Sequence, residues 1–565
     1  MSAAGDGGPA RRRVWPAWES ELAVVRAADG EGLVRAVEEA ISLARDHSRA
    51  PLASFARTLL RRLPEGRVCL AIVAATLDEF ERKAAHALRK ISDPECRRIQ
   101  DRSGIFYTAE PLYAPGTVGL LFPGEGCQYP DMLRELCLHF PEVRHEFDLV
   151  DLACRLVDDD FTPSAHIFGG PLRGREGTLW NMGAAVEAVS AADTGMMRLF
   201  QALAVPVGAV VGHSSGEFAA LEMAGVLRFQ NDVDHVALIR DGYRNIRALE
   251  RRSDIPAGIL ISVGGVDQGD VEAVLEAHPN RVLLAMHNCP HQFVLCSDPS
   301  IVDEVAKTLS AQGGLVQTLP FDRPYHTPWF EPALDGLNEL FAGRTLHAPS
   351  VPLYSCSTAD RFPADAAGIR ELCVVQWTRR VRFDETIRRM HDDGIRLFVD
   401  IGPRGNLAAF ASDILKGRPH EAIAANRHLR SSLTQLHFAL GQLVAHGVPA
   451  RLEYLHERRR TPTLDEVAPF AATPTTVRLA TRLPAPRLDG IEPVAAVPAP
   501  APAPSRVPAP SAVPAADPPA GEPIAPADAL LPDPMRAYFD TMDRFIETQQ
   551  RLVSRFLRDP GKPPS

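Results

Sequence analysis

Short apolar runs alternate with amphipathic stretches along most of this chain. Between residues 116 and 447 the runs have the length of buried strands, and the stretches between them have the spacing of helices. This alternation is typical of a mainly parallel sheet covered by helices. We therefore predict an α/β fold for a large domain at residues 113–455.

Residues 256–322 interrupt this domain with a different order of predicted strands and helices. The segments follow as strand "GILISV", helix "GDVEAVLEAH", strands "RVLLAMH" and "QFVLCS", helix "SIVDEVAKTLSAQ" and strand "LVQTL". That order is the split, ferredoxin-like arrangement. We predict a ferredoxin-like subdomain inserted into the larger domain.

The pattern changes toward both ends of the chain. Residues 1–13 have no periodicity and predict a disordered tail. Residues 14–112 combine helical patterns with one strand-like run, "RVCLAIVA", which indicates a small α/β domain. Residues 456–530 pass into a Pro/Ala-rich spacer. Residues 531–560 begin with a capping Asp-Pro pair and carry an apolar stripe, so they predict an amphipathic helix.

Composition narrows the class of protein. The 565 residues, 45% of them hydrophobic, suffice for one large domain with smaller attachments. The formal net charge of -10 argues against nucleic acid and against an anionic membrane as partners. No run of about 18 apolar residues occurs, and the basic N-terminal segment lacks the apolar core of a leader peptide. The nine cysteines contain no CxxC pair, so we expect no metal site, no disulfide framework and a cytoplasmic location.

The strongest chemical signal is a Gly-x-Ser-x-Gly turn. The apolar run "VPVGAVV" leads into "GHSSG" at residues 212–216 and continues as a helical segment. Strand, tight turn and helix in this order expose the central Ser214 as a nucleophile. They also aim the helix N-terminus, with the amide of Ser215, at the oxyanion that forms when Ser214 attacks. A second apolar run, "TVGLLF", ends in the glycine-rich turn "PGEGCQYP", whose amides could complete an oxyanion hole.

Together these motifs carry a family resemblance. "LLFPGEGCQYPDM" and "GHSSGEFAAL" resemble, in sequence and in order, motifs of the acyltransferase domains of polyketide and fatty acid synthases and of malonyl-CoA:acyl carrier protein transacylases. The resemblance runs from about residue 116 to residue 427. It implies a hydrolase-like α/β fold and an enzyme that moves a malonyl-type acyl group from coenzyme A to the phosphopantetheine thiol of a carrier protein. It implies no permanently bound cofactor, with malonyl-CoA as substrate.

The resemblance also assigns the site residues. His326, in "PFDRPYHTPWF", matches the histidine partner of the serine, and a neutral imidazole can take the hydroxyl proton and return it to the leaving thiolate. The backbone carbonyl of Gln376 is implied to hold that ring, and the backbone amides of Glu125 and Ser215 to form the oxyanion hole. Arg240, in "HVALIRDGYRNI", matches the carboxylate-binding arginine if one inserted residue is allowed. Its guanidinium could hold a carboxylate through two parallel hydrogen bonds. The alternative is a solvated helix arginine.

Four further residues are implied to line the substrate pocket: Gln128, His213, Asn288 and Tyr325. The bulky Tyr325 resembles malonyl-selective members of the family. The chain departs from the family at Glu125, where a glutamine is usual, at Cys127, where a serine is usual, and at Val186, where a glutamine often lies. A carboxylate at position 125 would oppose a developing oxyanion unless it points to solvent or has a partner.

Expected partners follow from the flanking segments. Residues 14–112 resemble the linker between ketosynthase and acyltransferase in large synthases, but neither a ketosynthase nor a "GxDS" attachment motif is found in the chain. We therefore expect an acyl carrier protein on another chain. The C-terminal helix is a candidate docking element for a ketosynthase or another synthase subunit, or else it folds back on the large domain. Two other functions stay open: an editing thioesterase that uses Ser214 and His326 with water, and a non-catalytic scaffold.

Overall fold

A computed structural model describes residues 18–62, 66, 68–158, 162–168, 182–319 and 323–467. All the described residues belong to one compact unit. The tail expected at residues 1–13 and the helix expected at residues 531–560 lie outside the described residues, as does most of the spacer.

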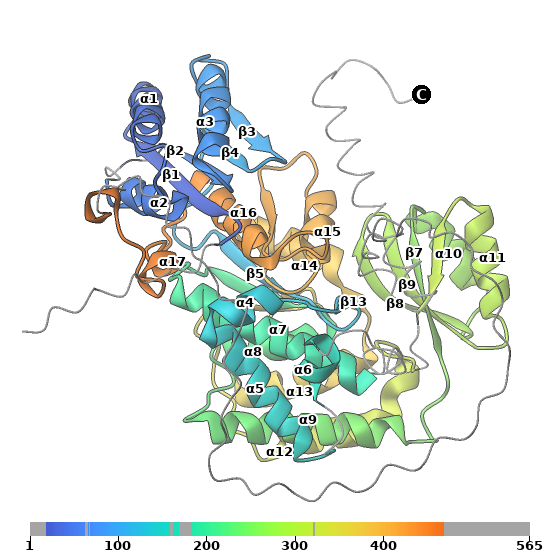
Figure 1. Ribbon diagram of the computed structural model, residues 1–565. Coiled ribbons are helices and arrows are strands. Elements are labelled where there is room, and N and C mark those ends of the chain that lie inside the picture. The colour runs from blue at the N-terminus through green and yellow to red at the C-terminus, as the bar shows by residue number, and fades with distance from the viewer. Residues whose placement is uncertain are drawn as a thin grey trace, which may run out of the picture. The chain divides into compact units, whose positions relative to one another are not determined.

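The N-terminal part forms a small α/β domain around an antiparallel sheet (Figure 1). Its helices are α1 (Gly30–Asp46), α2 (Leu52–Arg61) and α3 (Leu77–Ile91). The sheet has the order β1 (Glu21–Ala27), β2 (Val68–Ala74), β4 (Ile105–Thr108), β3 (Arg98–Asp101). The sequence predicted only the strand that became β2. It missed β1 and the four-residue strands β3 and β4, of which the last two are too short to show a period.

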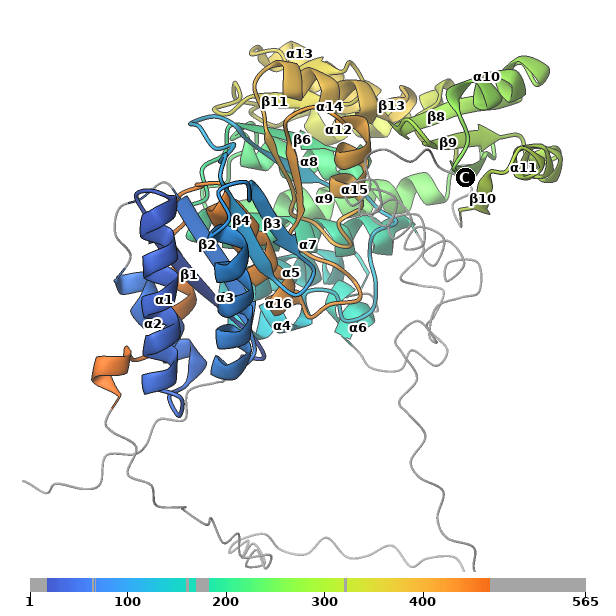
Figure 2. The same ribbon diagram turned by 90° about the horizontal axis from the view of Figure 1, so that it is seen from above.

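This sheet has two buried faces. Leu70 and Ile72 of β2 point into the core of the small domain, whereas Ala71 and Val73 belong to the core of the large domain. Because successive side chains of β2 point to opposite faces of the sheet, this one strand contributes side chains to both cores. Helix α16 (Ser432–Ala445) of the large domain packs on the second face; Figure 2 shows it behind the sheet, with α1 and α3 in front. The two domains therefore share a continuous apolar interface.

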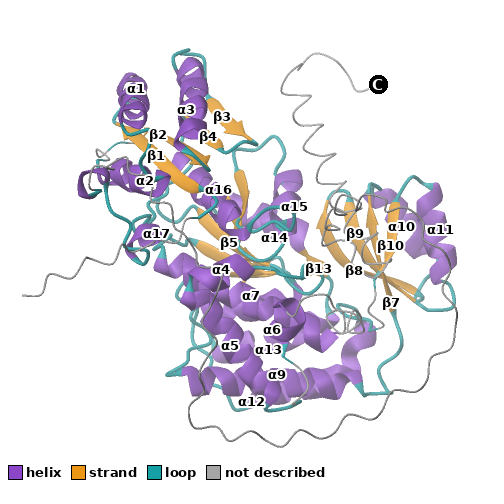
Figure 3. Ribbon diagram, in the orientation of Figure 1, coloured by secondary structure: helices purple, strands orange, loops and turns teal. Residues whose placement is uncertain are grey.

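The large domain is built on a six-stranded sheet with helices around it, shown by secondary structure in Figure 3. All its strand pairs are parallel except β12 with β11. The predicted mainly parallel α/β fold is therefore confirmed. The order is β12 (Asp360–Arg361), β11 (Leu353–Ser355), β6 (Ala209–Gly212), β5 (Val118–Phe122), β14 (Leu397–Asp400), β15 (Glu421–Ala424).

Strands β5 and β6 place the two glycine-rich turns side by side. They are parallel neighbours, with Leu121 opposite Val211 and Phe122 opposite Gly212. Both strands therefore end at the same edge of the sheet, where each continues into its turn. The helices of the large domain are α4 (Arg134–His139), α5 (Pro141–Arg155), α6 (Pro163–Phe168), α7 (Met182–Ala202), α8 (Glu217–Met223), α9 (Asp232–Glu250), α12 (Leu334–Ala342), α13 (Ala366–Val375), α14 (Phe383–Asp392), α15 (Asn406–Ile414), α16 and α17 (Tyr454–Glu457).

The inserted subdomain has the predicted ferredoxin-like order. Its elements are β7 (Ile259–Gly264), α10 (Gln268–Ala277), β8 (Val282–Cys289), β9 (Gln292–Ser297), α11 (Val302–Ala311) and β10 (Leu315–Thr318). The sheet order is β10-β7-β9-β8, and a fifth strand, β13 (Val381–Arg382) of the large domain, pairs in parallel with β8. That short strand joins the subdomain to the large domain, and a two-residue strand leaves no periodic signal in a sequence.

Among the helices of the described ranges, none combines the length and the apolar character that crossing a membrane requires.

Candidate active site

Ser214 lies at a sharp turn between β6 and α8. Its φ of 55° is left-handed, and a short 3-10 turn, Ser214–Gly216, leads into the helix. A Cβ on Gly212 would lie 2.2 Å from the backbone nitrogen of Glu217, and one on Gly216 would lie 2.2 Å from the carbonyl oxygen of Phe122. Only glycine fits at either position. The Gly-x-Ser-x-Gly pattern is therefore a steric requirement of the turn that presents the Ser214 hydroxyl.

His326 reaches this hydroxyl from the far end of the inserted subdomain. Its Nε2 lies 2.7 Å from Oγ of Ser214, and its Nδ1 lies 3.0 Å from the carbonyl oxygen of Gln376. Since a carbonyl can only accept, Nδ1 carries the proton and Nε2 is left as an acceptor facing Ser214. The His326 ring also stacks on Trp377, with the ring planes 11° apart. The structure thus brings together Ser214, His326 and Gln376, and the partner of the ring is a backbone carbonyl.

Burial sets the protonation of His326. Ser214 is 4% exposed and His326 is 1% exposed. Loss of hydration disfavours the imidazolium and lowers the pKa of His326 to about 4, although the hydrogen bond to the Gln376 carbonyl acts in the opposite direction. The ring is therefore neutral near pH 7 and available as a base.

The two glycine-rich turns are tied together by a pair of side chains. The Ser215 hydroxyl donates to Oε2 of Glu125 over 2.6 Å, and the backbone amide of Glu125 lies 3.2 Å from the same hydroxyl. Gln128, fully buried, accepts from the amide of Gly126 at 2.7 Å and so holds the first turn. The Glu125 carboxylate has a hydroxyl partner and does not stand alone at the site. Sequence reasoning missed this pair, although a serine at 215 opposite a glutamate at 125 was a usable signal.

A chain of buried hydrogen bonds joins the turn to the inserted subdomain. Nε2 of His213 lies 2.6 Å from Oδ1 of Asn288, the Asn288 amide donates to Gln292 at 2.6 Å, and Gln292 donates to the Ser262 hydroxyl at 2.9 Å. Burial lowers the pKa of His213, so the ring is neutral and donates to Asn288. His213 and Asn288, both predicted for the substrate pocket, are thus engaged with each other. Gln292 and Ser262 were not foreseen.

Tyr325 is the buried residue that immediately precedes His326. It is 5% exposed, and its ring packs edge to face on Phe330 at 4.8 Å between centroids. The Trp377 ring, which stacks on His326, lies 6.3 Å from the Tyr325 ring. Tyr325 therefore belongs to the aromatic cluster that supports His326.

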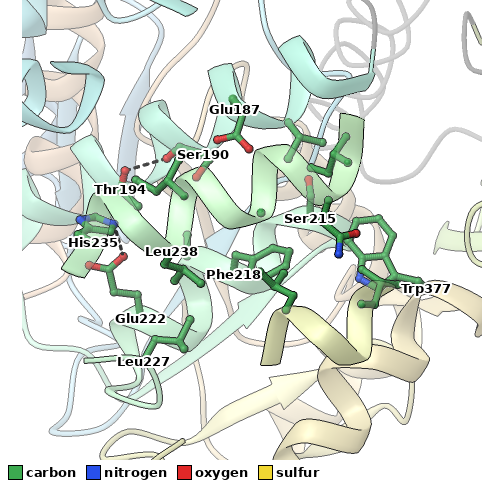
Figure 4. Close-up of a pocket in the computed structure, with 18 residues that line it drawn as sticks. Glu187, Ser190, Thr194, Ser215, Phe218, Glu222, Leu227, His235, Leu238 and Trp377 are labelled. Atoms are coloured by element: carbon green, nitrogen blue, oxygen red, sulfur yellow. Dashed lines mark hydrogen bonds and ion pairs between the residues drawn. The ribbon is translucent and has the colours of Figure 1, made fainter. Parts of the chain in front are cut away.

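A pocket between α7, α8, α9 and α12 reaches Ser215 and Trp377, which are neighbours of Ser214 and His326. It holds about 760 Å³ of space free of protein atoms, its open mouth included. Figure 4 shows Ser215 and Trp377 at one end, Glu222, His235 and Thr194 at the other, and Phe218 and Leu238 between them. Ser215 adjoins Ser214 in sequence, and Trp377 stacks on His326, so the near end of the pocket lies at the reacting groups.

The comparison with known families decides the class of protein. The family described as "Acyl transferase domain" matches residues 120–448, which is more than half of the chain. The chain belongs to the acyl transferase domain family. The enzyme class predicted from the sequence, an acyltransferase, is confirmed by this membership.

Relatives of this acyl transferase domain include synthases and a separate enzyme. Polyketide synthase GfsA of Streptomyces halstedii is 30% identical over 347 residues, 59% of this chain but 4% of that protein. The malonyl CoA-acyl carrier protein transacylase of Bacillus subtilis is 29% identical over 296 residues, 51% of this chain and 86% of that protein. The acyltransferase domain from module 8 of the salinomycin polyketide synthase shares the fold, with a TM-score of 0.63 and 20% identity over 77% of this chain and 98% of that domain. The chain thus spans a small part of GfsA.

Arg240 of this acyl transferase domain lies outside the pocket wall. Its Nε and Nη2 donate to Oδ1 of Asp241 at 3.0 and 2.7 Å, and its side chain is 34% exposed. The other oxygen of Asp241 accepts from Arg344 at 2.9 Å. Ile239 and Gly242 line the pocket in this part of α9. Successive helix residues point about 100° apart, so lining by Ile239 directs Arg240 to a neighbouring face. The structure therefore does not bring Arg240 to the pocket, in contrast to the sequence prediction.

Proposed function

We propose that this acyltransferase moves an acyl group from a coenzyme A thioester to the phosphopantetheine thiol of a carrier protein through an ester on Ser214. The 2.7 Å contact between the Ser214 hydroxyl and a neutral His326 carries the proposal. The relative from Bacillus subtilis, which bears the name of a malonyl CoA-acyl carrier protein transacylase, supports the choice of donor and acceptor.

The first half-reaction loads the serine. Oγ of Ser214 attacks the thioester carbonyl carbon while Nε2 of His326 takes the hydroxyl proton. The carbonyl electrons move to oxygen, and the amide of Ser215 would donate to the resulting oxyanion, joined by the amide of Glu125 once it leaves the Ser215 hydroxyl. The carbonyl re-forms as the carbon–sulfur bond breaks. The thiolate of coenzyme A then takes the proton from His326, which leaves acyl-Ser214 and a neutral ring.

The second half-reaction runs the same steps in reverse with another thiol. The carrier thiol gives its proton to His326, the sulfur attacks the ester carbon, and Oγ of Ser214 leaves and regains the proton. Coenzyme A and the carrier end in the same phosphopantetheine arm, so one site can serve both thiols.

The imidazolium exists only between proton transfers. With a pKa near 4, His326 does not keep a proton at pH 7, so the charged ring forms only alongside the oxyanion. The dipole of the Gln376 carbonyl, 3.0 Å from Nδ1, stabilises the charge during that interval. This fits the two acyl-transfer steps, because the charged ring is needed only while each tetrahedral intermediate exists, whereas the acyl-Ser214 ester persists between the steps with a neutral ring.

Two finer parts of the sequence prediction stay predictions. The carrier is expected on another chain. The malonyl-type acyl group was implied by the family resemblance, with Tyr325 and Arg240 as supporting residues; of these, Arg240 is paired with Asp241 and is not among the residues that line the pocket.

The test is transfer to a carrier. The protein is mixed with an acyl-coenzyme A and a phosphopantetheinylated acyl carrier protein, and acylated carrier and free acid are measured separately. We expect acylated carrier with two-step, ping-pong kinetics, and loss of transfer in Ser214→Ala and His326→Ala. Ser310→Ala, on the exposed face of α11, is the matched serine control and should transfer normally. Free acid without acylated carrier would instead indicate the thioesterase alternative.

A further inference from the structure

The pocket that ends at Ser215 and Trp377 offers space for the acyl group that Ser214 would carry. The near end of that pocket is formed by Ser215, which follows the nucleophile Ser214, and by Trp377, whose carbonyl accepts from the His326 amide at 2.8 Å. The substituent of a carbonyl carbon on Oγ of Ser214 would have this pocket as the nearby space lined by neighbours of both reacting residues. What lines the pocket decides which acyl groups are accepted.

The wall that the substituent meets first is apolar. Its side chains come from α7, α8, α9 and α12 and include Val186, Phe218, Leu238, Ile239, Leu337 and Leu340. Among the described residues that line the pocket there is no arginine and no lysine. A carboxylate moved from water to such a wall would lose its hydration with no cation to replace it.

The pocket is also lined by acids. Burial raises the pKa of Glu187, which lies between the two ends in Figure 4, to about 8, so this residue keeps its proton near pH 7 and brings no positive charge. Glu222 is engaged by Arg198, and the same arginine donates to Glu146 at 2.8 Å, so this cation is already shared between two carboxylates. Burial lowers the pKa of His235, which leaves its ring neutral. Among the described residues around Glu222 and His235, a second carboxylate would meet carboxyl groups and no available positive charge.

Residue 239 belongs to the apolar wall of the pocket. The residue 25 positions after Ser214 is Ile239, which lines the pocket, and the arginine is one position later, on a face where it pairs with Asp241. Val186, on the facing helix α7, is also apolar and also lines the pocket. Two neighbouring parts of the wall are thus hydrocarbon where a carboxylate would need hydrogen-bond donors.

We propose that this pocket accepts an uncharged acyl chain of several carbons and discriminates against malonyl and other carboxylated groups. The inference rests on the proposed function, because it concerns the acyl group that Ser214 carries. The apolar stretch through Phe218 and Leu238 holds the chain, and the absence of a cation among the described lining residues excludes the carboxylate.

The experiment compares hexanoyl-coenzyme A with malonyl-coenzyme A. Each thioester is mixed with the full chain, and the rate of adduct formation is followed by intact mass. We expect hexanoyl to load at least tenfold faster than malonyl. Equal or faster loading of malonyl would overturn the proposal. An absence of adduct with both thioesters, or an adduct that persists in Ser214→Ala, would instead refute the proposed function.

Two variants test the pocket wall directly. Ile239→Arg supplies the missing guanidinium and should raise the malonyl to hexanoyl rate ratio at least tenfold, while Ile239→Met, of similar volume, should leave the ratio unchanged. An unchanged ratio in folded Ile239→Arg, as judged by circular dichroism and thermal melting, would contradict the assignment of this pocket.

Arg240→Gln tests the carboxylate site independently, because this variant does not place an arginine inside the pocket. On this proposal it leaves the malonyl to hexanoyl ratio as it is in the natural chain. Arg244→Gln, on the same helix and 3.4 Å from the same Asp241 carboxylate, controls for the loss of one positive charge. A selective loss of malonyl loading in Arg240→Gln alone would return the carboxylate site to Arg240 and overturn the inference.

Discussion

Ser214 and His326 meet through Oγ and Nε2 at 2.7 Å, and both have a left-handed backbone, with φ of 55° and 61°. They are 112 positions apart in the chain, on opposite sides of the inserted subdomain. A positive φ costs a residue with a Cβ about 1 kcal/mol or more, and such residues persist where the surrounding fold holds them. Each turn therefore stores strain in order to direct its side chain at the other.

Relief of that strain at the serine can be measured. Ser214→Gly and Ser214→Ala both lack the hydroxyl and should not form an adduct, but only glycine adopts a φ of 55° without cost. We expect Ser214→Gly to exceed Ser214→Ala in free energy of unfolding by about 1 kcal/mol, as measured by urea titration. An alanine variant as stable as the glycine variant would show that the turn is not strained.

The pH dependence of loading reports on His326. The ring acts when neutral, and burial lowers its pKa from 6.5 to about 4. The second-order rate of Ser214 acylation should therefore be flat from pH 8 down to about 5.5 and fall only toward pH 4. A midpoint near 6.5 would mean that the ring is hydrated.

The same shift has a consequence for stability. Below pH 6.5 the unfolded chain takes up a proton on His326 before the folded chain does, so this residue's contribution to stability is lost as pH falls from 6.5 toward 4. Circular dichroism at each pH separates this loss of fold from loss of the base.

The pair of Ser215 and Glu125 should matter for rate. Ser215→Ala removes the hydroxyl that donates to the Glu125 carboxylate over 2.6 Å and accepts from the Glu125 amide at 3.2 Å, so the carboxylate loses this partner. We expect acylation to slow about tenfold, a modest loss compared with that of an oxyanion donor itself, since both amides remain. Glu125→Gln keeps an acceptor and removes the charge, so it should load at least as fast as the natural chain. An inactive Glu125→Gln would show that the carboxylate itself is needed.

A buried ion pair fastens the N-terminal domain. Arg459 donates to both oxygens of Glu21 at 2.6 and 2.8 Å, with side chains 6% and 5% exposed, and its guanidinium lies 3.5 Å from the Trp18 ring centroid. Arg459→Met leaves a buried carboxylate and should lower the free energy of unfolding by about 3 to 5 kcal/mol. Unfolding by guanidinium chloride measures the change in this free energy.

Two controls accompany this prediction. Glu21→Leu combined with Arg459→Met should be more stable than Arg459→Met alone, because no charge is then left without its partner. Arg418→Met breaks an exposed pair with Asp392 and should cost less than about 1 kcal/mol. A double variant no more stable than Arg459→Met alone would place the loss in packing instead of charge.

The sequence was informative where sterics and period dictate the structure. The Gly212 and Gly216 positions required a turn that admits no Cβ, and the order of segments in residues 256–322 fixed the ferredoxin-like topology. It was less informative for β3 and β4, because four residues are too few to show alternation. The pairing of the small sheet with α16 joins segments far apart in the chain, which no local pattern can reveal.

Arg240 shows that the number of residues after Ser214 does not by itself predict which side chains of α9 line the pocket. One inserted residue between Ser214 and α9 can be absorbed before the helix or within it, and the two choices differ by about 100° in the direction of every later side chain. The helix begins at Asp232, after Asn231 caps the amides of Val233 and Asp234. With this start Ile239 lines the pocket and Arg240 does not. The phase of a helix depends on its cap and packing, which the count of residues from the serine does not contain.

The central claim is that Ser214 carries the acyl group. The protein is incubated briefly with hexanoyl-coenzyme A, weighed intact and digested, and the peptide that contains residues 212–216 is identified by mass. We predict one added hexanoyl group, on Ser214. A carrier thiol should remove this group, and it should not appear on the His326→Ala variant. An acyl group on any other residue, or an equal yield in Ser214→Ala, would contradict this prediction.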